Sequence, residues 1–552
     1  MDELPLKSFE TERRARYLNA VSAARILALM LGFTIMPPTD PSPRMKNFSS
    51  KFAALSSIVT HICNLSGIPG VSIGILHHDE VVYQASFGYA DVENKVHCDS
   101  DTTYVLGSLS KAFTAALLSS LVDENALGWD TLLKDVLTDF HRSDVYGDIT
   151  IADLLTHRTG LAALDSLWLA SDNIPFLKRS EAISILNHAP AVRPFRADFL
   201  YNNFAYEVLS QVIENRTGTT FSEALHKRLL NPLSMSRTYY TSDTMENEAS
   251  PYAALTNTSV VRIPPAIKGK DNPSGRSENP IKNILKLWRG QMPLPSRSLR
   301  EHSYAFGWAR AQLPAILAPG DNGKSELSPV VGTGAPSRLA LYHGGSIPGY
   351  NTYNALFPET GSAVIVLTNS LSLNGGVRWI GELLIEALFD NLENAVDYGD
   401  LARKSAKSTI DEVADLNKKL SDGQTVSKPT RSLDSYVGRY CNAAGNFFVD
   451  INHNEKEETL FVSYMGRSAD TFQLVTYKED SFSWSLTYDE LVERARYTVD
   501  PIDYHIIKFE ADKTGSNIQC LWWRHDSELK EPGEAFYKRQ EESQTMDENQ
   551  EL

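Results

Sequence analysis

Two residues able to perform nucleophilic chemistry, Ser108 and Lys111, stand three positions apart in this chain. The apolar residues around them recur at a spacing of three and four, which predicts a helix: Leu109, Phe113, Ala116, Leu117 and Leu121. One turn of that helix brings the lysine ammonium over the serine hydroxyl. The positive end of the helix dipole and partial burial should both lower the lysine pKa toward neutrality. A neutral lysine can then take the serine proton, which activates the serine as a nucleophile.

The same serine has a simpler interpretation. A hydroxyl at the start of a helix ordinarily caps the free backbone N–H groups there. A second Ser-x-x-Lys also occurs at Ser527 to Lys530, in a polar segment with no apolar helix behind it. The motif alone is therefore a weak signal, and its context has to decide.

Two other motifs favour structural roles. Gly70-x-Ser72-x-Gly74 matches the nucleophile elbow of α/β-hydrolases, but that serine should follow a strand and begin a helix. Here the motif lies inside a strand, so we interpret Ser72 as a buried strand serine. His157 falls in the last turn of a short helix that ends at Gly160, where packing and helix termination are its expected roles.

The elements that would position Ser108 come from both ends of one long segment. Strand-like runs occupy residues 70–89 at one end and 339–369 at the other, and helical patterns fill the middle. This order predicts an α/β fold whose sheet is assembled from the two ends. Helices are also expected at 51–66 and 377–390, a strand at 306–309, and a long irregular insertion at 245–300.

The pattern of residue types in the sequence changes near residue 400. A charged stretch, 400–430, reads as a linker helix plus loop. Seven short aromatic runs then predict a small antiparallel barrel or sandwich: 436–440, 447–451, 460–464, 471–477, 481–488, 504–509 and 518–523. An acidic tail follows Gln540, and we expect it to be disordered.

Composition excludes several function classes. The chain has 552 residues and a formal net charge of −16, without the clustered Lys and Arg that phosphate contacts need, so no nucleic-acid partner is expected. The four cysteines show no metal-ligand spacing, and neither His-Glu-x-x-His nor a Gly-rich phosphate cradle occurs. We therefore expect no metal and no cofactor.

The N-terminus leaves the compartment open between cytoplasmic and secreted. Basic residues precede the apolar run 26–36, whose eleven residues are too few to cross a bilayer. A signal-peptide core and an amphipathic helix packed on the body are both compatible with it. No firm membrane partner follows from this pattern.

Three motifs in order carry a family resemblance: Ser108-Leu109-Ser110-Lys111, Tyr201-Asn202-Asn203 and His343-Gly344-Gly345. Together they resemble the serine beta-lactamase and penicillin-binding protein superfamily, in particular its class C, esterase and transesterase branch. The similarity covers roughly residues 50–390, and the run 433–440 is similar to the opening of the lipocalin-like barrel that often follows this domain.

The resemblance implies a beta-lactamase/transpeptidase-like fold, an antiparallel sheet flanked by helices with a helical subdomain, followed by a small all-β barrel. The expected division is a leader or extension, a catalytic domain, a linker, a lipocalin-like barrel and an acidic tail, at 1–45, 46–395, 396–430, 431–540 and 541–552.

The resemblance also implies covalent acyl transfer through an acyl-enzyme on Ser108. Lys111 and Tyr201 would share the proton, and Tyr201 could be the general base if neighbouring cations lowered its pKa. Asn203 would hold Lys111 and the substrate carbonyl in register. The oxyanion would lie between the backbone N–H groups of Ser108 and Ser346, beside Gly345. Without the resemblance, Tyr201 would be a half-buried aromatic residue and Asn203 a helix cap.

The third motif departs from the Lys-Thr-Gly of penicillin-recognising members, because His343 replaces the lysine. A histidine of ordinary pKa is mostly neutral at pH 7, so capture of a substrate carboxylate should be weak. This disfavours beta-lactamase activity and favours a carboxylesterase or an acyltransferase, as in fungal polyketide transesterases of this branch.

The expected partner is a small-molecule acyl substrate, as an ester, amide or thioester, with an alcohol acceptor or an acyl-carrier thioester as open alternatives. A role in secondary metabolism would fit. Hydrolysis and transesterification are not distinguished by the motifs, since both use the same nucleophile. Two other readings stay open: a catalytically inactive binding protein that kept the fold, and a secreted D-aminopeptidase-like enzyme acting on peptide termini.

Overall fold

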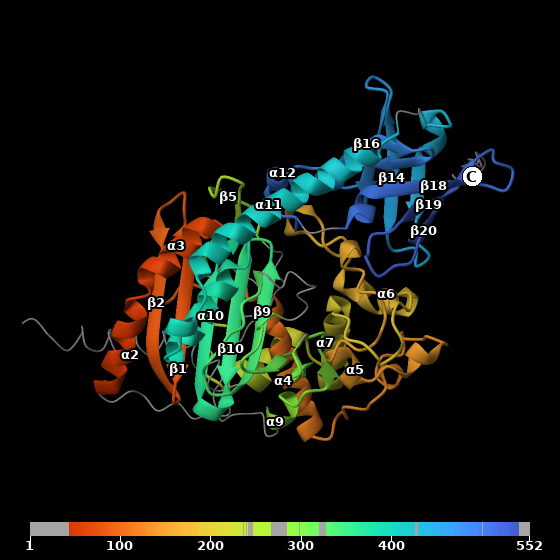
Figure 1. Ribbon diagram of the computed structural model, residues 1–552. Coiled ribbons are helices and arrows are strands. Elements are labelled where there is room, and N and C mark those ends of the chain that lie inside the picture. The colour runs from red at the N-terminus through yellow and green to blue at the C-terminus, as the bar shows by residue number, and fades with distance from the viewer. Residues whose placement is uncertain are drawn as a thin grey trace, which may run out of the picture.

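The computed structural model describes residues 43–539, apart from 236, 239, 241–246, 266–283, 297, 319–326, 426–428 and 499–500. The apolar run 26–36 and the acidic tail therefore lie outside the described residues. Two bodies fill the described chain, a large sheet flanked by helices and a barrel built from the last hundred or so residues (Figure 1).

The large sheet has nine strands in the order β3-β2-β1-β11-β10-β9-β8-β7-β6. Their bounds are β1 Gly70–His77, β2 Glu80–Asp91, β3 Val96–His97, β6 Met292–Pro293, β7 His302–Tyr304, β8 Ala309–Gln312, β9 Leu339–Ile347, β10 Tyr350–Phe357 and β11 Ser362–Thr368. All pairings are antiparallel, and β1 pairs with β11 from Val71 opposite Thr368 to Leu76 opposite Ala363. The sheet is thus assembled from the two ends of the segment, as predicted.

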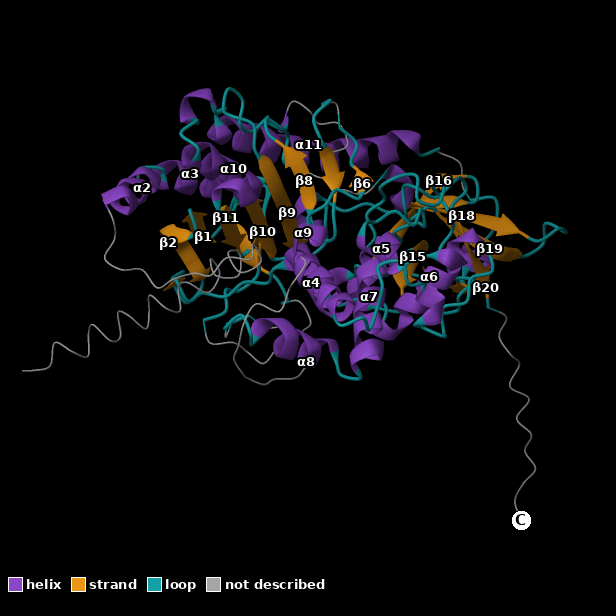
Figure 2. Cartoon of the chain, turned by 90° about the horizontal axis from the view of Figure 1, so that it is seen from below, coloured by secondary structure: helices purple, strands orange, loops and turns teal. Residues whose placement is uncertain are grey.

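Helices cover both faces of this sheet (Figure 2). On one face lie α2 Pro43–Ala53, α3 Ser56–Ser66, α10 Gly376–Leu388 and the start of α11 Tyr398–Gly423. On the other side lies the helical part, which consists of α4 Ser110–Asp123, α5 Ile151–Leu155, α6 Ala182–His188, α7 Asn203–Thr217, α8 Phe221–Leu225 and α9 Ile284–Leu287; α5 and α6 lie toward the barrel, away from the sheet. Since both faces are covered, the central strand β11 reads as a continuous apolar run with six of its seven residues buried.

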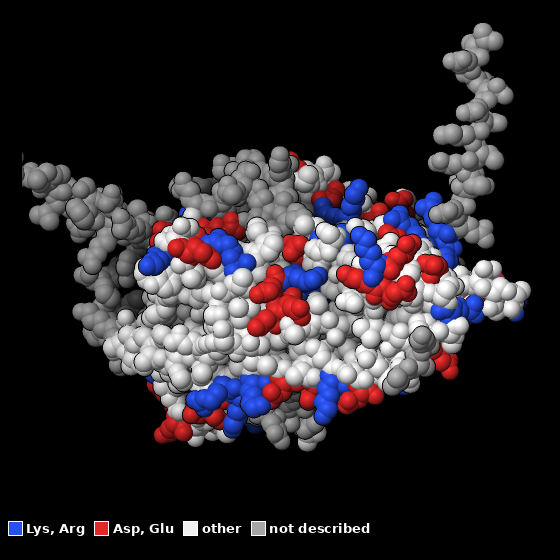
Figure 3. Space-filling model, turned by 90° about the horizontal axis from the view of Figure 1, so that it is seen from above, with Lys and Arg blue, Asp and Glu red and all other residues white. Residues whose placement is uncertain are grey.

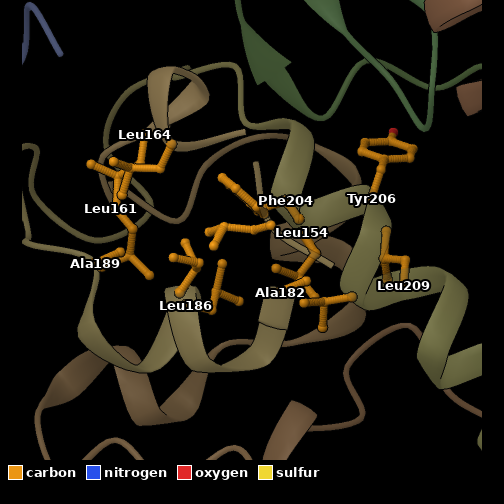
Figure 4. Packing of buried hydrophobic residues seen from close by; sticks show 14 of the residues in the cluster. Leu154, Leu161, Leu164, Ala182, Leu186, Ala189, Phe204, Tyr206 and Leu209 are labelled. Carbon is orange, nitrogen blue, oxygen red and sulfur yellow. The ribbon is translucent and has the colours of Figure 1, made fainter. Parts of the chain in front are cut away.

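The helical part has its own apolar core, which extends into the barrel core. Leu154 of α5, Leu186 of α6 and Leu209 of α7 meet there with Leu161 and Leu164 from the intervening loop (Figure 4). Each of these five residues exposes at most 3% of its surface. This packing anchors the loop that follows α5, which reaches the candidate site described below.

Two local predictions were wrong. The stretch 245–300 is not wholly irregular, because β4 Tyr252–Ala254 and β5 Val260–Arg262 form a small sheet with β12 Ser370–Leu371, and α9 and β6 also lie in it. Residues 306–308 of the predicted strand 306–309 are instead in the turn between β7 and β8, where Gly307 has a φ of +75°, and only Ala309 lies in a strand, β8. The positive φ explains why an apolar run containing glycine turns here rather than extends.

The C-terminal strands close into an eight-stranded antiparallel barrel, because β20 pairs back onto β13. Their bounds are β13 Gly438–Cys441, β14 Phe448–Asn454, β15 Thr459–Tyr464, β16 Thr471–Lys478, β17 Ser481–Ser483, β18 Ile506–Ala511, β19 Ile518–Trp523 and β20 Glu534–Lys538. Aromatic side chains fill the interior, among them Tyr464, Trp484 and Trp523. The sequence patterns did not predict β20, in which only Phe536 is fully buried. They also predicted a strand over 481–488, whereas β17 ends at Ser483 and helix α12, Tyr488–Glu493, begins at the last of these residues.

The barrel packs directly against the helical part. Asp470 of the barrel accepts a hydrogen bond from the Ser171 N–H at 2.9 Å, and the Asp172 N–H donates to the Arg494 carbonyl at 2.8 Å. Phe176 and Phe447 add an edge-to-face ring contact across the same boundary, with centroids 5.3 Å apart. The long helix α11 leads from the sheet to the barrel (Figure 1).

The surface seen in Figure 3 carries small groups of basic and acidic side chains separated by uncharged surface. Among the residues that the structure describes, none of the helices combines the length and apolar character required of a membrane span.

Candidate active site

The candidate nucleophile lies at the junction of a 3₁₀ turn, η1 (Gly107–Leu109), and helix α4. Neither helix start uses a side-chain cap from Ser108, so the capping interpretation does not apply. The Nζ atom of Lys111 lies 3.2 Å from the Ser108 Oγ. The second Ser-x-x-Lys, Ser527 to Lys530, lies in a loop between β19 and β20, where no helix aligns its two side chains.

Two glycines let strand β9 approach this turn. Gly107 has a φ of +57°, and a methyl group added to it would lie 2.8 Å from the Ser346 backbone nitrogen. A methyl group at Gly345 would collide with the Leu106 carbonyl oxygen. Any larger residue at either position would push β9 away from η1. The backbone N–H groups of Ser108 and Ser346 are thereby held on neighbouring segments.

Helix α7 supplies the second group of side chains. Its N-cap is Asn202, whose side chain accepts from the Ala205 N–H at 2.9 Å, so Asn203 is free of the capping role. The Asn203 Oδ1 instead accepts from the Lys111 Nζ at 2.8 Å. The ring of Tyr201 lies beside Lys111, and the Ser108 side chain acts on the Tyr201 phenol. The four residues Ser108, Lys111, Tyr201 and Asn203 are therefore brought together.

Lys111 lies in a setting that favours its neutral form. Only 6% of the residue is exposed, and burial lowers its pKa to about 7, against a smaller opposing effect of the Asp165 carboxylate. The rings of Tyr201 and Tyr206 face the Nζ atom at 4.7 and 5.2 Å, which keeps some favourable interaction with the protonated form. A lysine with this pKa exchanges protons readily at neutral pH.

Tyr201 shows the opposite of the shift that a phenolate base would need. Burial raises its pKa, and the neighbouring Ser108 side chain offsets only part of that effect. The phenol is therefore protonated at neutral pH and can donate a hydrogen bond or a proton. Lys111 is the better base of the two.

His343, the third-motif residue, is buried in β9 with 4% of its surface exposed. Its Nε2 lies 3.0 Å from the Tyr304 hydroxyl and its Nδ1 2.6 Å from the Gly344 carbonyl oxygen. Burial lowers its pKa to about 4, so the ring is neutral at pH 7. The imidazole supports Tyr304 and offers no positive charge to a substrate.

His157 holds the loop that carries Tyr201. It follows α5 with a φ of +54°, and its Nδ1 accepts from the Asn202 N–H at 3.0 Å. The ring packs against Tyr201 with centroids 4.2 Å apart and is completely buried. Burial lowers its pKa, which keeps it neutral. This environment agrees with a packing role.

A family model with the description "Beta-lactamase" matches residues 58–386. The chain belongs to the beta-lactamase family. The matched range includes Ser108, Lys111, Tyr201, Asn203 and the third motif.

The chain is similar to an unguisins hydrolase of Aspergillus campestris. The two sequences are 27% identical over 409 residues, which cover 68% of this chain and 73% of that protein. A second unguisins hydrolase, from Aspergillus violaceofuscus, is 29% identical over 37% of this chain and 36% of its own length. Protein flp of Staphylococcus aureus is 24% identical over 57% of this chain and 62% of that protein.

The octameric penicillin-binding protein homologue from Pyrococcus abyssi is similar in structure, with a TM-score of 0.51 at 20% identity. The match covers 88% of this chain and all of that one. This likeness shows the fold, and it extends over the sheet, the helical part and the barrel.

A cavity of about 1830 Å³ opens above Ser108 in this beta-lactamase family member. Its walls come from η1, the loop after α5, strand β9 and two segments of the barrel, and its surface is mostly apolar. Ligand cavities of small-molecule enzymes measure about 300–1,000 Å³, so this one has room for a large substrate. In the described chain, no group of three or more His, Cys, Asp or Glu side chains is arranged to hold a metal ion.

Sequence reasoning missed two residues at this site. Asp165, in the 3₁₀ turn η4 (Asp165–Leu167), accepts from the Asn203 Nδ2 at 3.1 and 3.2 Å with its two oxygens. Tyr497, between α12 and β18, accepts a hydrogen bond from the Ser346 hydroxyl at 3.3 Å. Neither belongs to a motif, because each reaches the site from a distant part of the chain. The one available signal for Asp165 was its position shortly after His157.

Proposed function

We propose that this protein is a serine hydrolase or acyltransferase that acts through an acyl-enzyme on Ser108, with esters as the first substrate class and amides or thioesters as further candidates. The observation that carries the proposal is the 3.2 Å separation between the Lys111 Nζ and the Ser108 Oγ, at a lysine whose pKa lies near 7. The hydrolase names of two relatives agree with this class.

In the proposed first half-reaction, the Ser108 Oγ attacks the ester carbonyl carbon while the neutral Lys111 amine takes the hydroxyl proton. The carbonyl π electrons move to the oxygen, which accepts hydrogen bonds from the N–H groups of Ser108 and Ser346. Collapse of this intermediate breaks the ester C–O bond. The leaving alkoxide receives its proton from Lys111 by way of the Tyr201 phenol, and the acyl group stays on Ser108.

In the second half-reaction, water or an alcohol attacks the acyl-enzyme carbonyl, and Lys111 takes the proton of the attacking group. The bond to the Ser108 Oγ breaks, and the serine recovers its proton. Water gives the carboxylic acid, and an alcohol gives a new ester. The large cavity favours keeping transesterification as a second candidate, because a donor and an acceptor can be accommodated in it together.

A catalytically inactive binding protein is the less favoured reading, because a serine, a lysine and a tyrosine are all within contact range. A D-aminopeptidase-like activity would require protonation of a poor amine leaving group. Amide and ester substrates with the same acyl group would separate these readings.

The test is covalent labelling of the full chain by a fluorophosphonate and by p-nitrophenyl esters, with and without alcohol acceptors. We expect an adduct on Ser108 by peptide mass spectrometry, and loss of at least about a thousandfold in kcat for Ser108→Ala. Ser527→Ala, in the second Ser-x-x-Lys, is the matched control and should retain the adduct. Full activity in Ser108→Ala, or no adduct on the wild-type protein, would reject the proposal.

A further inference from the structure

The amide of Asn203 connects two charged groups. Its oxygen accepts from the Lys111 Nζ at 2.8 Å, and its nitrogen donates to both carboxylate oxygens of Asp165. An ionised carboxylate can only accept hydrogen bonds. Asp165 therefore requires the NH₂ group of Asn203 on its own side, and this requirement turns the amide oxygen toward Lys111.

The position of Asp165 is itself determined from three directions. Leu164 has a φ of +53° and packs its side chain into the helical core (Figure 4). Its N–H donates to the Asp526 carboxylate of the barrel at 2.9 Å. On the other side of Asp165, the Ser166 hydroxyl forms a hydrogen bond with the Nδ1 of His525 at 2.6 Å. Residues 164–166 are thus held by hydrogen bonds to the barrel loop 525–526.

We propose that Asp165 is a positioning residue for the acyl-transfer site: held in place by the barrel, it orients the Asn203 amide and supplies a negative charge that favours the protonated form of Lys111. This inference rests on the proposed function, because it assigns Lys111 the role of base. It gives the barrel an indirect effect on the chemistry, since Asp526 and His525 hold the turn that carries Asp165.

The charged and titratable groups around the pair agree with this assignment. Four of the groups facing Lys111 are uncharged at pH 7, because burial raises the pKa of two phenols and lowers that of two imidazoles: Tyr201, Tyr206, His157 and His343. The Asp165 carboxylate raises the pKa of Lys111, whereas burial lowers it. Asp165 in turn faces Lys111 and Asp526, and burial raises its own pKa to about 6, so it is mostly ionised at pH 7.

The test is the pH dependence of the second-order rate at which a fluorophosphonate labels Ser108. This rate requires the nucleophile and base but neither a natural substrate nor product release. In the wild-type protein it should rise with pH through the titration of Lys111. In Asp165→Asn, removal of the negative charge should move that rise to lower pH by about one unit, and the plateau should fall because the amide of Asn203 is no longer oriented.

Two variants separate this role from a structural one. Asp165→Glu keeps the charge, so its pH profile should stay near that of the wild type even if its plateau is lower. Asp153→Asn, at a buried aspartate paired with Arg158 and Arg196 away from Lys111, should lower the unfolding temperature without moving the profile. Asp165→Ala serves as a second neutral variant should Asp165→Asn not fold.

An unmoved profile in a folded neutral variant would overturn the inference, as would a profile in Asp165→Glu that moves as far as that of Asp165→Asn. Absence of any Ser108 labelling in the wild-type protein would instead reject the proposed function. The two failures are therefore distinguishable.

Discussion

The hydroxyl of Ser346 donates a hydrogen bond to the phenol of Tyr497 at 3.3 Å, which ties the candidate oxyanion strand β9 to a residue carried by the C-terminal barrel. Burial raises the Tyr497 pKa to about 12, so the phenol is neutral at pH 7. The cleft is thus completed by a segment more than 300 residues beyond Ser108 in the chain.

Removal of the Tyr497 hydroxyl should weaken stabilisation of the oxyanion, because Ser346 supplies one of its two proposed N–H donors. A neutral hydrogen bond contributes about 0.5–1.5 kcal/mol, so we expect kcat/KM for p-nitrophenyl esters to fall about two- to tenfold in Tyr497→Phe. Tyr537→Phe, at an exposed barrel position, is the matched control and should behave as wild type. Unchanged kinetics in Tyr497→Phe would show that the contact has no part in the reaction.

The activity should follow the titration of Lys111. Its lowered pKa of about 7 means that the amine is protonated and inactive below that pH and neutral above it. We therefore expect kcat/KM to rise as the pH increases from about 6 to about 8 and then to level off. A flat or falling profile across that range would contradict the assignment of Lys111 as the base.

Lys111→Arg gives an independent check, because a guanidinium stays protonated at all working pH values. It should lower kcat/KM by at least about a hundredfold. Lys404→Arg, at an exposed position on α11, should have no effect. Near-wild-type activity in Lys111→Arg would remove the lysine from the mechanism.

His343 should give no preference for substrates with a carboxylate. With a pKa lowered to about 4, the buried ring is neutral from about pH 5.5 upward. We expect the ratio of kcat/KM for a carboxylate-bearing ester to that for its neutral analogue to stay constant between about pH 5.5 and 8. The titration of Lys111 changes kcat/KM for both esters by the same factor, so it does not affect their ratio. A ratio that increases as the pH falls would mean that His343 becomes a cation and faces the substrate.

The contact between barrel and helical part should contribute strongly to stability. Asp470 is fully buried and accepts from the Ser171 N–H, from Arg467 and from Arg496. Asp470→Asn leaves the buried guanidinium of Arg496 without its anion, which costs about 3–5 kcal/mol in the free energy of unfolding.

Urea unfolding followed by tryptophan fluorescence would measure that loss. The comparison variant is Glu531→Gln, in the exposed ion pair with Lys508, which should cost at most about 1 kcal/mol. Equal effects of the two substitutions would show that the Asp470 contact does not stabilise the assembly of the two parts.

Much of the fold was predictable because periodic patterns report which face of an element is buried. The alternation and apolar runs of β1, β10 and β11 correctly predicted a sheet built from both ends of the segment. The barrel was predicted from its aromatic runs, although β20 was missed, because a strand with one fully buried residue has little apolar signal. The strands β4 and β5 were missed because each has only three residues, which is too short to show a period, although all three residues of β4 are buried.

In the candidate site, too, some features were predicted from the sequence and others were not. The contact between Ser108 and Lys111 followed from spacing, since backbone geometry places residues three apart on the same side of a helix. The expected lowering of the lysine pKa has the direction found in the structure. The lowering of the Tyr201 pKa that neighbouring cations were expected to cause is not found, because burial raises this pKa and the Asp165 carboxylate raises it further.

By itself, then, the sequence determined the order of the three motifs, the pairing of Ser108 with Lys111, and the general architecture, because each of these depends on local spacing or on periodic burial. Tertiary structure alone decided that Asp165 meets Asn203, that Tyr497 meets Ser346, and how far each ionisable group is removed from water. The physical reason is that these properties depend on which distant segments come into contact, and neither a motif nor a hydrophobic period carries that information.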